Sequence, residues 1–199
     1  MSDIDKTEPA AYIGLVNPKS PANIGSVMRA AGCFNAAGVF YTGTRFERAA
    51  RFNTDTKNIS TRIPLTAASN LLEVVPPASK IVCIELVEGA ISLTDFQHPQ
   101  AAFYIFGPED GTISQHLIDQ ADAVVYIPTT GCLNLAATVN IVLYDRAAKA
   151  PQTNTGDELI RASRDTNNRV KVKTQPGNVP PAVDNLLPAD RNTRTVNRN

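Results

Sequence analysis

Arg29 has the most unusual setting of any charged residue in this sequence. It shares one face of a predicted helix with Gly25, Gly32 and Ala36, and each glycine inside a helix costs roughly 1 kcal/mol relative to alanine. We therefore expect something to approach this face closely. A guanidinium holds its proton at a pKa above ~12, so Arg29 suits the positioning and stabilisation of negative charge better than general-base catalysis. The alternatives are tight packing of the glycine face against a sheet, and a surface arginine paired with a carboxylate.

Other common catalytic sets are poorly supported. The two histidines, His98 and His116, have no plausible Cys, Ser or metal-ligand partner nearby in the sequence, which argues against a catalytic triad and a zinc site. Cys33, Cys83 and Cys132 are odd in number and far apart, so we expect reduced thiols and no bound metal. Neither GxGxxG nor GxxxxGK[ST] occurs. A nucleotide ligand would therefore bind without either phosphate cradle.

The elements that must position these residues follow from the apolar pattern. Short apolar runs at 11–16, 38–43, 80–87, 101–107 and 123–128 alternate with helical patterns. Continuous apolar runs of this length are typical of strands that are covered on both faces. We therefore predict an α/β fold, with a parallel sheet flanked by helices.

Two of the predicted helices carry clear signals. Ser20 can cap the first, Pro21 fits its first turn, and Gly38 can end it. The last helix, over 133–149, has two apolar faces, one with Leu135, Val139 and Val142 and the other with Ala137, Ile141 and Tyr144. Two apolar faces imply two packing partners. One partner is the sheet and the other can be a second subunit, so we expect a homodimer.

Charge and composition divide the chain near residue 150. Residues 161–199 contain eight Lys or Arg and three Asp or Glu, a net charge of +5, while the first 160 residues balance to −5. A basic tail on an acidic body fits nucleic-acid contact, although a solvated tail is the commoner explanation. From Pro151 the chain is rich in Asn, Thr, Pro and Arg. We predict a globular domain over 1–150 and an extended or partly disordered tail over 151–199.

The sequence gives no sign of a membrane segment. Its apolar runs are far shorter than the roughly 20 residues that span a bilayer. The first residues, MSDIDKTEPA, are acidic where a signal peptide is basic. We therefore expect a cytoplasmic protein with no membrane partner.

Three segments stand out in order along the predicted domain. They are NPKSPANIGSVMRAAGCFNAAGV (17–39), FGPEDGTIS (106–114) and IPTTGCLNLAATVNIVLYD (127–145). Together they resemble the SpoU (TrmH) family of SPOUT RNA methyltransferases. The resemblance implies a deep C-terminal trefoil knot, a topology that is rare among folds. It also implies that S-adenosylmethionine binds in the knot, that a homodimer completes the active site, and that a ribose 2'-hydroxyl of RNA is methylated.

The resemblance assigns four residues to the catalytic site. Arg29 would act on the ribose hydroxyl and the neighbouring phosphate, and Asn23 would support Arg29 and the substrate. Glu109 would have a structural or substrate-orienting role, and a solvated turn residue beside Asp110 is the alternative. Asn134 matches an Asn of the family, and it can also serve as the N-cap of the last helix.

The resemblance also assigns the cofactor contacts. Backbone amides and carbonyls of Gly107, Ile127 and Leu133 would hold S-adenosylmethionine, with Leu86 as a weaker candidate. A residue without a Cβ after a buried strand allows close approach by a ligand. A plain strand-ending turn explains Gly107 equally well.

The RNA-binding candidates are Arg45, Arg48 and Arg51, in a basic segment that continues to residue 62. Such side chains suit phosphate contacts, and a solvated loop is the alternative. We expect tRNA rather than rRNA as the substrate, because the short relatives without a separate RNA-binding domain include tRNA wobble-position enzymes.

Two other functions stay open at this point. Cys132 and Ala136 stand where the family usually has serine, which permits a non-catalytic RNA-binding protein that keeps the knotted fold. The presence of Asn23, Arg29, Glu109 and Asn134 argues against that alternative. A generic α/β small-molecule enzyme is the other alternative, and it would have no affinity for RNA.

Overall fold

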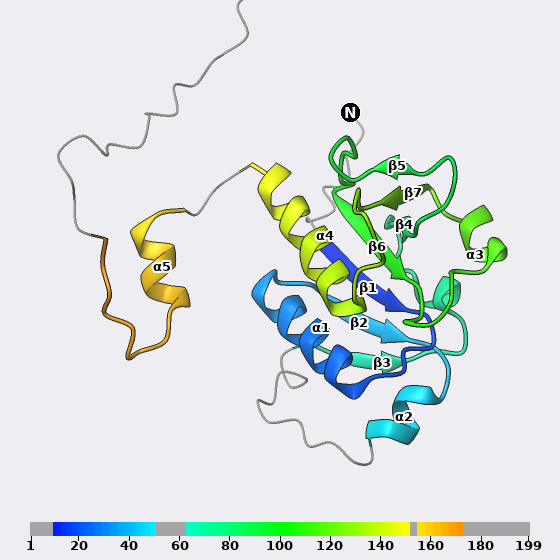
Figure 1. The fold of residues 1–199 in the computed structure, drawn as a ribbon, viewed down its shortest axis with the longest axis horizontal. Coiled ribbons are helices and arrows are strands. Elements are labelled where there is room, and N and C mark those ends of the chain that lie inside the picture. The colour runs from blue at the N-terminus through cyan, green and yellow to red at the C-terminus, as the bar shows by residue number, and fades with distance from the viewer. Residues whose placement is uncertain (1–9, 51–62, 152–154, 173–199) are drawn as a thin grey trace, which may run out of the picture. The chain divides into compact units, whose positions relative to one another are not determined.

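The computed structural model describes residues 10–50, 63–151 and 155–172. The chain divides into one unit up to residue 153 and another from residue 154. In the described part, the first unit holds a seven-stranded parallel sheet of order β3-β2-β1-β6-β4-β7-β5 (Figure 1). The strands are β1 (Ala10–Leu15), β2 (Gly38–Tyr41), β3 (Leu65–Ala67), β4 (Lys80–Ile84), β5 (Ile91–Ser92), β6 (Ala101–Phe106) and β7 (Ala123–Tyr126). The helices are α1 (Pro21–Cys33), α2 (Arg45–Ala50), η2 (Leu71–Val74, a 3-10 helix), α3 (Gln115–Asp119), α4 (Leu135–Lys149) and α5 (Asp157–Ser163).

The sheet agrees with the strands expected from the sequence. All five apolar runs form strands, and the predicted α/β class with a parallel sheet is confirmed. β3 and β5 are additional, and at three and two residues they are too short to give an apolar run. Strand β6 lies in the centre of the sheet between β1 and β4, and all six of its residues are buried. This explains why its sequence, AAFYIF, is continuously apolar.

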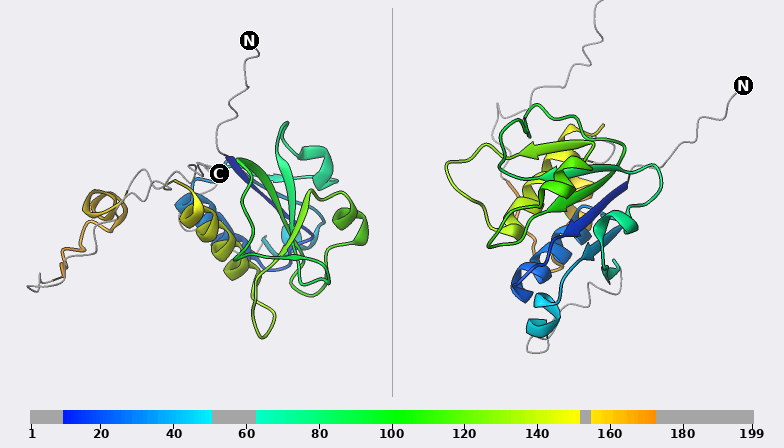
Figure 2. Two further views of the ribbon diagram at one scale, coloured as in Figure 1. Left: turned by 90° about the horizontal axis from the view of Figure 1, so that it is seen from above. Right: turned by 90° about the vertical axis from the view of Figure 1, so that its right-hand side faces the viewer.

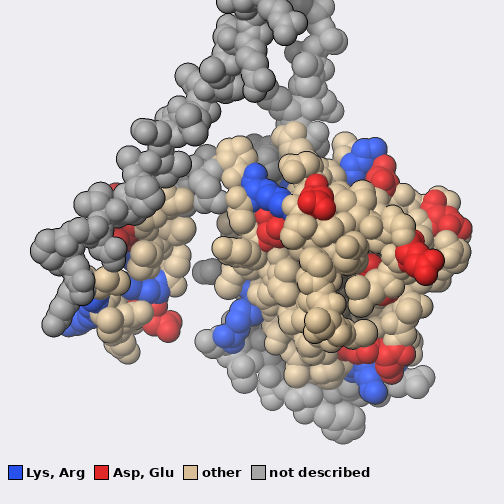
Figure 3. Space-filling model, turned by 45° about the horizontal axis from the view of Figure 1, so that its top comes forward, with Lys and Arg blue, Asp and Glu red and all other residues tan. Residues whose placement is uncertain are grey.

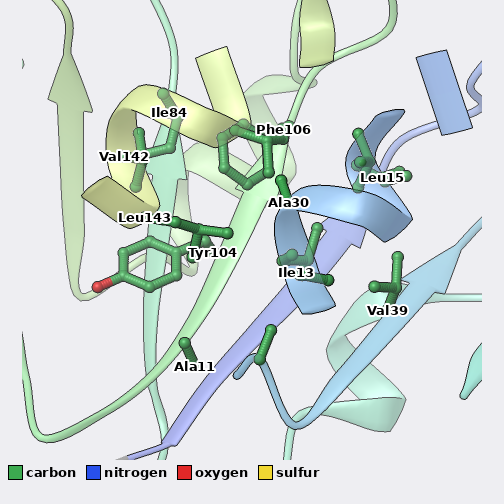
Figure 4. Close-up of a cluster of buried hydrophobic side chains, with 14 of the residues drawn as sticks. Ala11, Ile13, Leu15, Ala30, Val39, Ile84, Tyr104, Phe106, Val142 and Leu143 are labelled. Atoms are coloured by element: carbon green, nitrogen blue, oxygen red, sulfur yellow. The ribbon is translucent and has the colours of Figure 1, made fainter. Parts of the chain in front are cut away.

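Helices cover both faces of the sheet. α1 and α4 lie side by side on one face, while η2 and α3 lie on the other (Figures 1 and 2). Between the sheet and the α1–α4 layer, Ile13, Val27 and Val142 have no exposed surface, and Figure 4 shows part of this cluster. Complete burial of one such side chain stabilises the fold by about 1.5–3 kcal/mol. The core therefore fixes α1 and α4 relative to the carboxyl ends of the strands.

The start of α1 follows the prediction and its end does not. The Ser20 hydroxyl accepts a hydrogen bond from the Asn23 amide at 3.3 Å, and Pro21 occupies the first turn. The helix ends at Cys33, and Asn35 then takes a left-handed conformation with φ of 52°. Asparagine tolerates this conformation well. The chain therefore turns before Gly38, which instead begins β2.

The glycine face of α1 is open within one chain. A Cβ built on Gly25 would have no described neighbour within 4 Å, and Gly25, Arg29 and Gly32 are all exposed. The alternative of tight packing against the sheet is therefore wrong for Gly25. No described part of the same chain approaches it closely.

Helix α4 has the two apolar faces that the sequence predicts. Leu135, Val139 and Val142 are buried against the rest of the domain. On the other side, Ile141 is 36% exposed and Tyr144 is 66% exposed. The second face therefore has no full cover within a single chain.

A network of polar side chains fixes the C-terminal half of α4. Arg146 donates hydrogen bonds to the carbonyls of Ala10, Pro99 and Gln100 and to the Tyr104 hydroxyl. His98 joins the Tyr104 hydroxyl to Asp145, at 2.6 Å and 2.8 Å respectively. The sequence gives no hint of these partners for His98, because Asp145 is 47 residues away.

Burial determines the protonation of this network. It lowers the pKa of His98 against the opposing effect of Asp145, and it raises the pKa of the Tyr104 hydroxyl. A neutral His98 satisfies every partner when its Nε2–H donates to Asp145 and its Nδ1 accepts from Tyr104. The network thus holds the segment before β6 against α4 without a buried unpaired charge.

The second unit contains one short helix among its described residues. α5 lies where the composition predicted an extended tail. Asp157 and Glu158 occupy its first turn, where carboxylates interact favourably with the helix dipole. The prolines that suggested an extended chain begin again only at Pro176. No described helix in either unit is long and apolar enough to cross a membrane.

We predict that Arg146→Ala lowers the free energy of unfolding by about 2–4 kcal/mol, because it leaves half-buried carbonyls and the Tyr104 hydroxyl without their donor. Urea unfolding followed by circular dichroism measures this change. Lys80→Ala is the matched control, since Lys80 forms an exposed ion pair with Asp122 and its loss should cost under about 1 kcal/mol. Equal losses for the two variants would contradict a stabilising role for the Arg146 network.

Candidate active site

The Glu109 carboxylate joins the loop after β6 to the start of α1. Its Oε2 accepts a hydrogen bond from the Lys19 amide at 2.9 Å, and its Oε1 accepts from the Ser20 amide at 3.0 Å. The Asn23 side-chain amide donates to the same Oε1 at 3.1 Å. A carboxylate in this position satisfies free N–H groups at a helix N-terminus and interacts favourably with the helix dipole.

Asn23 extends this arrangement to α4. The Asn134 side-chain nitrogen donates to Asn23 Oδ1 at 2.9 Å, although the two residues are 111 positions apart. The Asn134 oxygen accepts from the amide of Ala136 at 2.9 Å and therefore caps α4. Asn134 thus caps α4, as the sequence suggested, and it also joins a polar cluster with Asn23.

The partners of Glu109, Asn23 and Asn134 determine the direction of each hydrogen bond among these three side chains. Glu109, when ionised, can only accept, so the nitrogen of Asn23 must face it. The Asn134 oxygen faces the helix amides, so its nitrogen must face the Asn23 oxygen. We call Glu109, Asn23 and Asn134 the polar triad. Each of the two amide nitrogens has a second N–H that bonds to no described residue and can donate to a ligand.

The protonation of Glu109 follows from its partners. Burial alone would raise its pKa, but hydrogen bonds from Asn23, Ser20 and Lys19 together outweigh that effect and lower the pKa below its ordinary value of 4.5. Glu109 is therefore an anion at neutral pH.

A cleft opens beside the polar triad at the carboxyl ends of β4, β6 and β7. Ligands of parallel α/β sheets bind at this edge. All four residues predicted to contact the cofactor line the cleft, namely Leu86, Gly107, Ile127 and Leu133, and Glu109 and Cys132 line it too. Leu86 is 52% exposed and Leu133 39% exposed. Apolar side chains exposed in a concave site suit an aromatic or aliphatic ligand surface.

Position 107 requires a glycine for a different physical reason from the one expected. A Cβ at this position would lie 2.9 Å from Glu85 Oε2 and 3.4 Å from the Ile113 side chain. The Glu85 carboxylate of the same chain therefore occupies the space that we had expected a ligand to need. Gly107 still lines the cleft through its backbone.

The sequence analysis missed Glu85. This residue follows the last residue of β4 and lines the cleft, and its carboxylate accepts hydrogen bonds from the amides of Leu86 and Ile113. A signal was available, because Glu85 is an acidic residue inside the apolar run 80–87.

Arg29 lies apart from the polar triad within one chain. It is exposed, and among the described residues it has no hydrogen-bond or ion-pair partner. Six residues separate it from Asn23 in α1, which corresponds to about 9 Å along the helix axis and about 120° around it. The alternative of an arginine paired with a surface carboxylate is therefore not observed among the described residues.

Of the three arginines proposed for RNA binding, only Arg45 has a described side chain. Arg45 forms two hydrogen bonds with the Asp110 carboxylate, at 2.8 Å and 2.9 Å, and thereby ties α2 to the loop that carries Glu109. The side chain of Arg48 and the whole of Arg51 lie outside the described residues. On the face drawn in Figure 3, the described charged side chains of the first unit are scattered and form no continuous basic surface.

We predict that the two roles of Asn134 can be separated by substitution. Asn134→Ala should lower the free energy of unfolding by about 1–2 kcal/mol, because it removes the cap of α4 and the bond to Asn23. Asn134→Ser retains a capping oxygen without placing a carboxylate against Asn23, and it should cost clearly less. Thermal unfolding compares the two variants. A larger loss for Ser than for Ala would contradict the assignment of Asn134 as the cap.

We predict that the stabilisation contributed by Glu109 disappears in acid. Because its folded-state pKa is lowered, the contribution is present above the unfolded-state pKa and is lost as the pH falls through the lower folded-state pKa. The difference in Tm between the wild type and Glu109→Gln should therefore be constant near neutrality and shrink below about pH 4.5. A difference that grows on acidification would contradict this account.

Comparison with known proteins agrees with this architecture. The model of the SpoU rRNA Methylase family matches residues 10–144. A search of curated proteins found no match. Among solved structures, an AdoMet-bound rRNA methyltransferase from Sinorhizobium meliloti is 22% identical with a TM-score of 0.62, and the alignment covers 75% of this chain and 60% of that one. The chain thus spans less than two thirds of the length of that relative.

Two further solved structures are of proteins described as acting on tRNA. The TrmH/SpoU tRNA modifying enzyme of A. aeolicus is 18% identical, with 72% of this chain and 77% of that chain covered and a TM-score of 0.62. A protein studied for the 2-OH methylation of C/U34 on tRNA is 19% identical, with 70% and 95% covered and a TM-score of 0.57. At these identities the structures show a common fold. Because the family model matches more than half of the sequence, from β1 to near the end of α4, the chain belongs to the SpoU rRNA methylase family.

Proposed function

We propose that this protein transfers a methyl group from S-adenosylmethionine to a ribose 2'-hydroxyl of RNA. The observation that carries the proposal is the polar triad beside the cleft, in which Asn23 and Asn134 each have a second N–H that bonds to no described residue. Membership of the SpoU family supports methyl transfer to RNA. The choice of the ribose oxygen rests on the donor groups, which suit a hydroxyl and its neighbouring phosphate.

The cleft suits the cofactor. Leu86, Ile127 and Leu133 supply apolar surface for an adenine ring, and the backbone of Gly107, Ile127 and Leu133 supplies the polar contacts. The sulfonium of S-adenosylmethionine supplies an electrophilic methyl group, so the protein mainly has to position the acceptor oxygen. This agrees with a site whose described residues include no histidine at the cleft.

In this proposal the side chains divide the work of holding the substrate. The free N–H groups of Asn23 and Asn134 orient the ribose, and Glu109 fixes the direction in which Asn23 presents its donor. The hydroxyl proton is lost to solvent as the methyl group is transferred. Arg29 stabilises the negative charge that develops on the ribose oxygen and contacts the adjoining phosphate, because a guanidinium holds its charge and can donate several hydrogen bonds.

We also propose that Arg29 acts in the cleft of a second subunit. Arg29 has no described partner in its own chain, and the α1 surface around Gly25 is open. The exposed apolar face of α4 with Ile141 and Tyr144 belongs to the same helical layer (Figure 1). A symmetric dimer through this layer would cover the apolar face and bring Arg29 to the partner's site.

The deep trefoil knot is part of the proposal. β7 lies in the sheet between β4 and β5, which both precede it in the sequence. After β7 the chain continues into α4, and Lys149 donates to the carbonyls of Leu93 and Phe96 in the segment after β5. A topology in which the last described strand lies between two earlier strands, and the helix that follows it contacts the segment after β5, supports a threaded chain.

We favour tRNA over rRNA as the substrate. The fold is shared over 95% of the protein studied for the 2-OH methylation of C/U34 on tRNA, so the two domains are similar in extent. The RNA contacts that we propose are Arg45, Arg48 and Arg51. For Arg45 this requires an RNA phosphate to compete with Asp110, which is half exposed, and an exposed ion pair of this kind is weak enough to be displaced.

We predict that Arg29→Ala lowers methyl transfer by about 100-fold or more, since loss of one donor to a developing oxyanion costs this much in other enzymes. The variant should keep the Tm and the affinity for S-adenosylhomocysteine of the wild type, because Arg29 is exposed and does not line the cleft of its own chain. Transfer of a tritiated methyl group to bulk tRNA and, separately, to bulk rRNA gives the rate. Calorimetry gives the affinity.

Ser26→Ala is the matched control, because Ser26 is also exposed on α1 and its loss should leave the rate unchanged. Unfolding of Arg29→Ala or loss of its cofactor affinity would make Arg29 a structural residue. If the wild type transfers no methyl group to tRNA or to rRNA, the proposed function is wrong.

A further inference from the structure

The Glu85 side chain connects three parts of the cleft. Its Oε2 accepts a hydrogen bond from the Ile113 amide at 2.9 Å, in the loop after β6. Its Oε1 accepts from the Leu86 amide at 3.0 Å, and its own backbone amide donates to the Val125 carbonyl of β7 at 3.0 Å. Through its side chain and its backbone amide, Glu85 thus links the ends of β4 and β7 to the end of the 107–113 loop.

The Glu85 carboxylate accepts hydrogen bonds from two backbone amides, those of Leu86 and Ile113. Hydrogen bonds from backbone amides to a carboxylate are stronger than those between neutral groups. The link from Glu85 to Ile113 is therefore a strong local restraint on a loop that has little regular structure before α3.

Gly107 leaves room for this carboxylate. Because a Cβ at residue 107 would lie 2.9 Å from Glu85 Oε2, alanine at this position would push the carboxylate away from Ile113. The two positions are therefore coupled. Glu85 can hold the loop only when residue 107 has no side chain.

We propose that Glu85 is a positioning residue that holds the 107–113 loop in the shape that the cofactor cleft and Glu109 require. This inference rests on the proposed function. By engaging the amide of Leu86, which lines the cleft, Glu85 also removes one donor from the cleft. Leu86 then presents its carbonyl and its exposed side chain to the ligand, which suits the amino group and the ring of an adenine.

The test compares Glu85→Ala, Glu85→Gln and Gly107→Ala with the wild type. Hydrogen exchange followed by NMR measures protection of the Ile113 amide, and calorimetry measures the affinity for S-adenosylhomocysteine. Glu85→Ala should lose about tenfold in both quantities, which is the loss expected for one charge-assisted hydrogen bond. Glu85→Gln should recover part of each loss, because its amide oxygen can still accept from one backbone N–H.

Gly107→Ala provides the second arm. It should reproduce the effects of Glu85→Ala, and the double variant should be no worse than Glu85→Ala alone, because the side chain that the new Cβ displaces is already absent. Glu88→Ala is the matched control. Glu88 lies with Glu85 in the connection between β4 and β5, is exposed and does not line the cleft. It should behave as the wild type does.

The outcomes separate this inference from the proposed function. Unchanged Ile113 protection in Glu85→Ala, or faster exchange with unchanged affinity for S-adenosylhomocysteine, overturns the positioning role. Additive effects of Glu85→Ala and Gly107→Ala overturn the coupling. A wild type that binds S-adenosylhomocysteine with the predicted dependence on Glu85, yet transfers no methyl group to RNA, overturns the proposed function alone. A wild type that does not bind this molecule overturns both.

Discussion

The hydrogen bonds around the Glu109 carboxylate are the interaction on which the candidate site depends. Three N–H groups from the start of α1 converge on it, and one of them belongs to Asn23. Because an ionised carboxylate only accepts, it fixes the orientation of the Asn23 amide, and Asn23 in turn fixes Asn134 at the start of α4. The loop after β6 and the first turns of two helices thereby form one rigid rim. The parallel sheet makes this possible, since it brings the carboxyl ends of β1, β4, β6 and β7 to one edge.

Helix α4 is held at both ends by polar interactions of different kinds. At its start, Asn134 caps the helix and belongs to the polar triad. Near its end, Arg146 and Lys149 donate hydrogen bonds to carbonyl groups of the segment between β5 and β6. Both apolar and polar contacts therefore place one face of α4 on the domain, while Ile141 and Tyr144 remain on the other. In the proposed dimer, this uncovered face and the open surface around Gly25 are the parts that a second subunit would use.

Much of the fold could be predicted from the sequence because its elements have local signals. The apolar runs identify five strands, and Ser20 and Pro21 identify the start of α1. The pairs that build the site have no local signal, because Glu109 and Asn23 are 86 residues apart and Asn23 and Asn134 are 111 apart. Family resemblance named these residues, and only the three-dimensional structure joined them. The glycine at position 107 correctly indicated that another group lies close to its backbone. The sequence did not identify that group, which is the Glu85 carboxylate.

A double-mutant comparison tests the polar triad most directly. Asn134→Asp places an acceptor on each side of Asn23, whereas Glu109→Gln keeps an oxygen that can accept from Asn23. In the double variant the glutamine side chain also offers a donor, so the Asn23 amide can rotate and bond to both neighbours in the reverse direction. Rates of methyl transfer under saturating cofactor give the coupling. The account predicts that the double variant is at least about fivefold more active than the product of the two single effects. Strictly multiplicative losses would contradict it, because Glu109, Asn23 and Asn134 would then act independently.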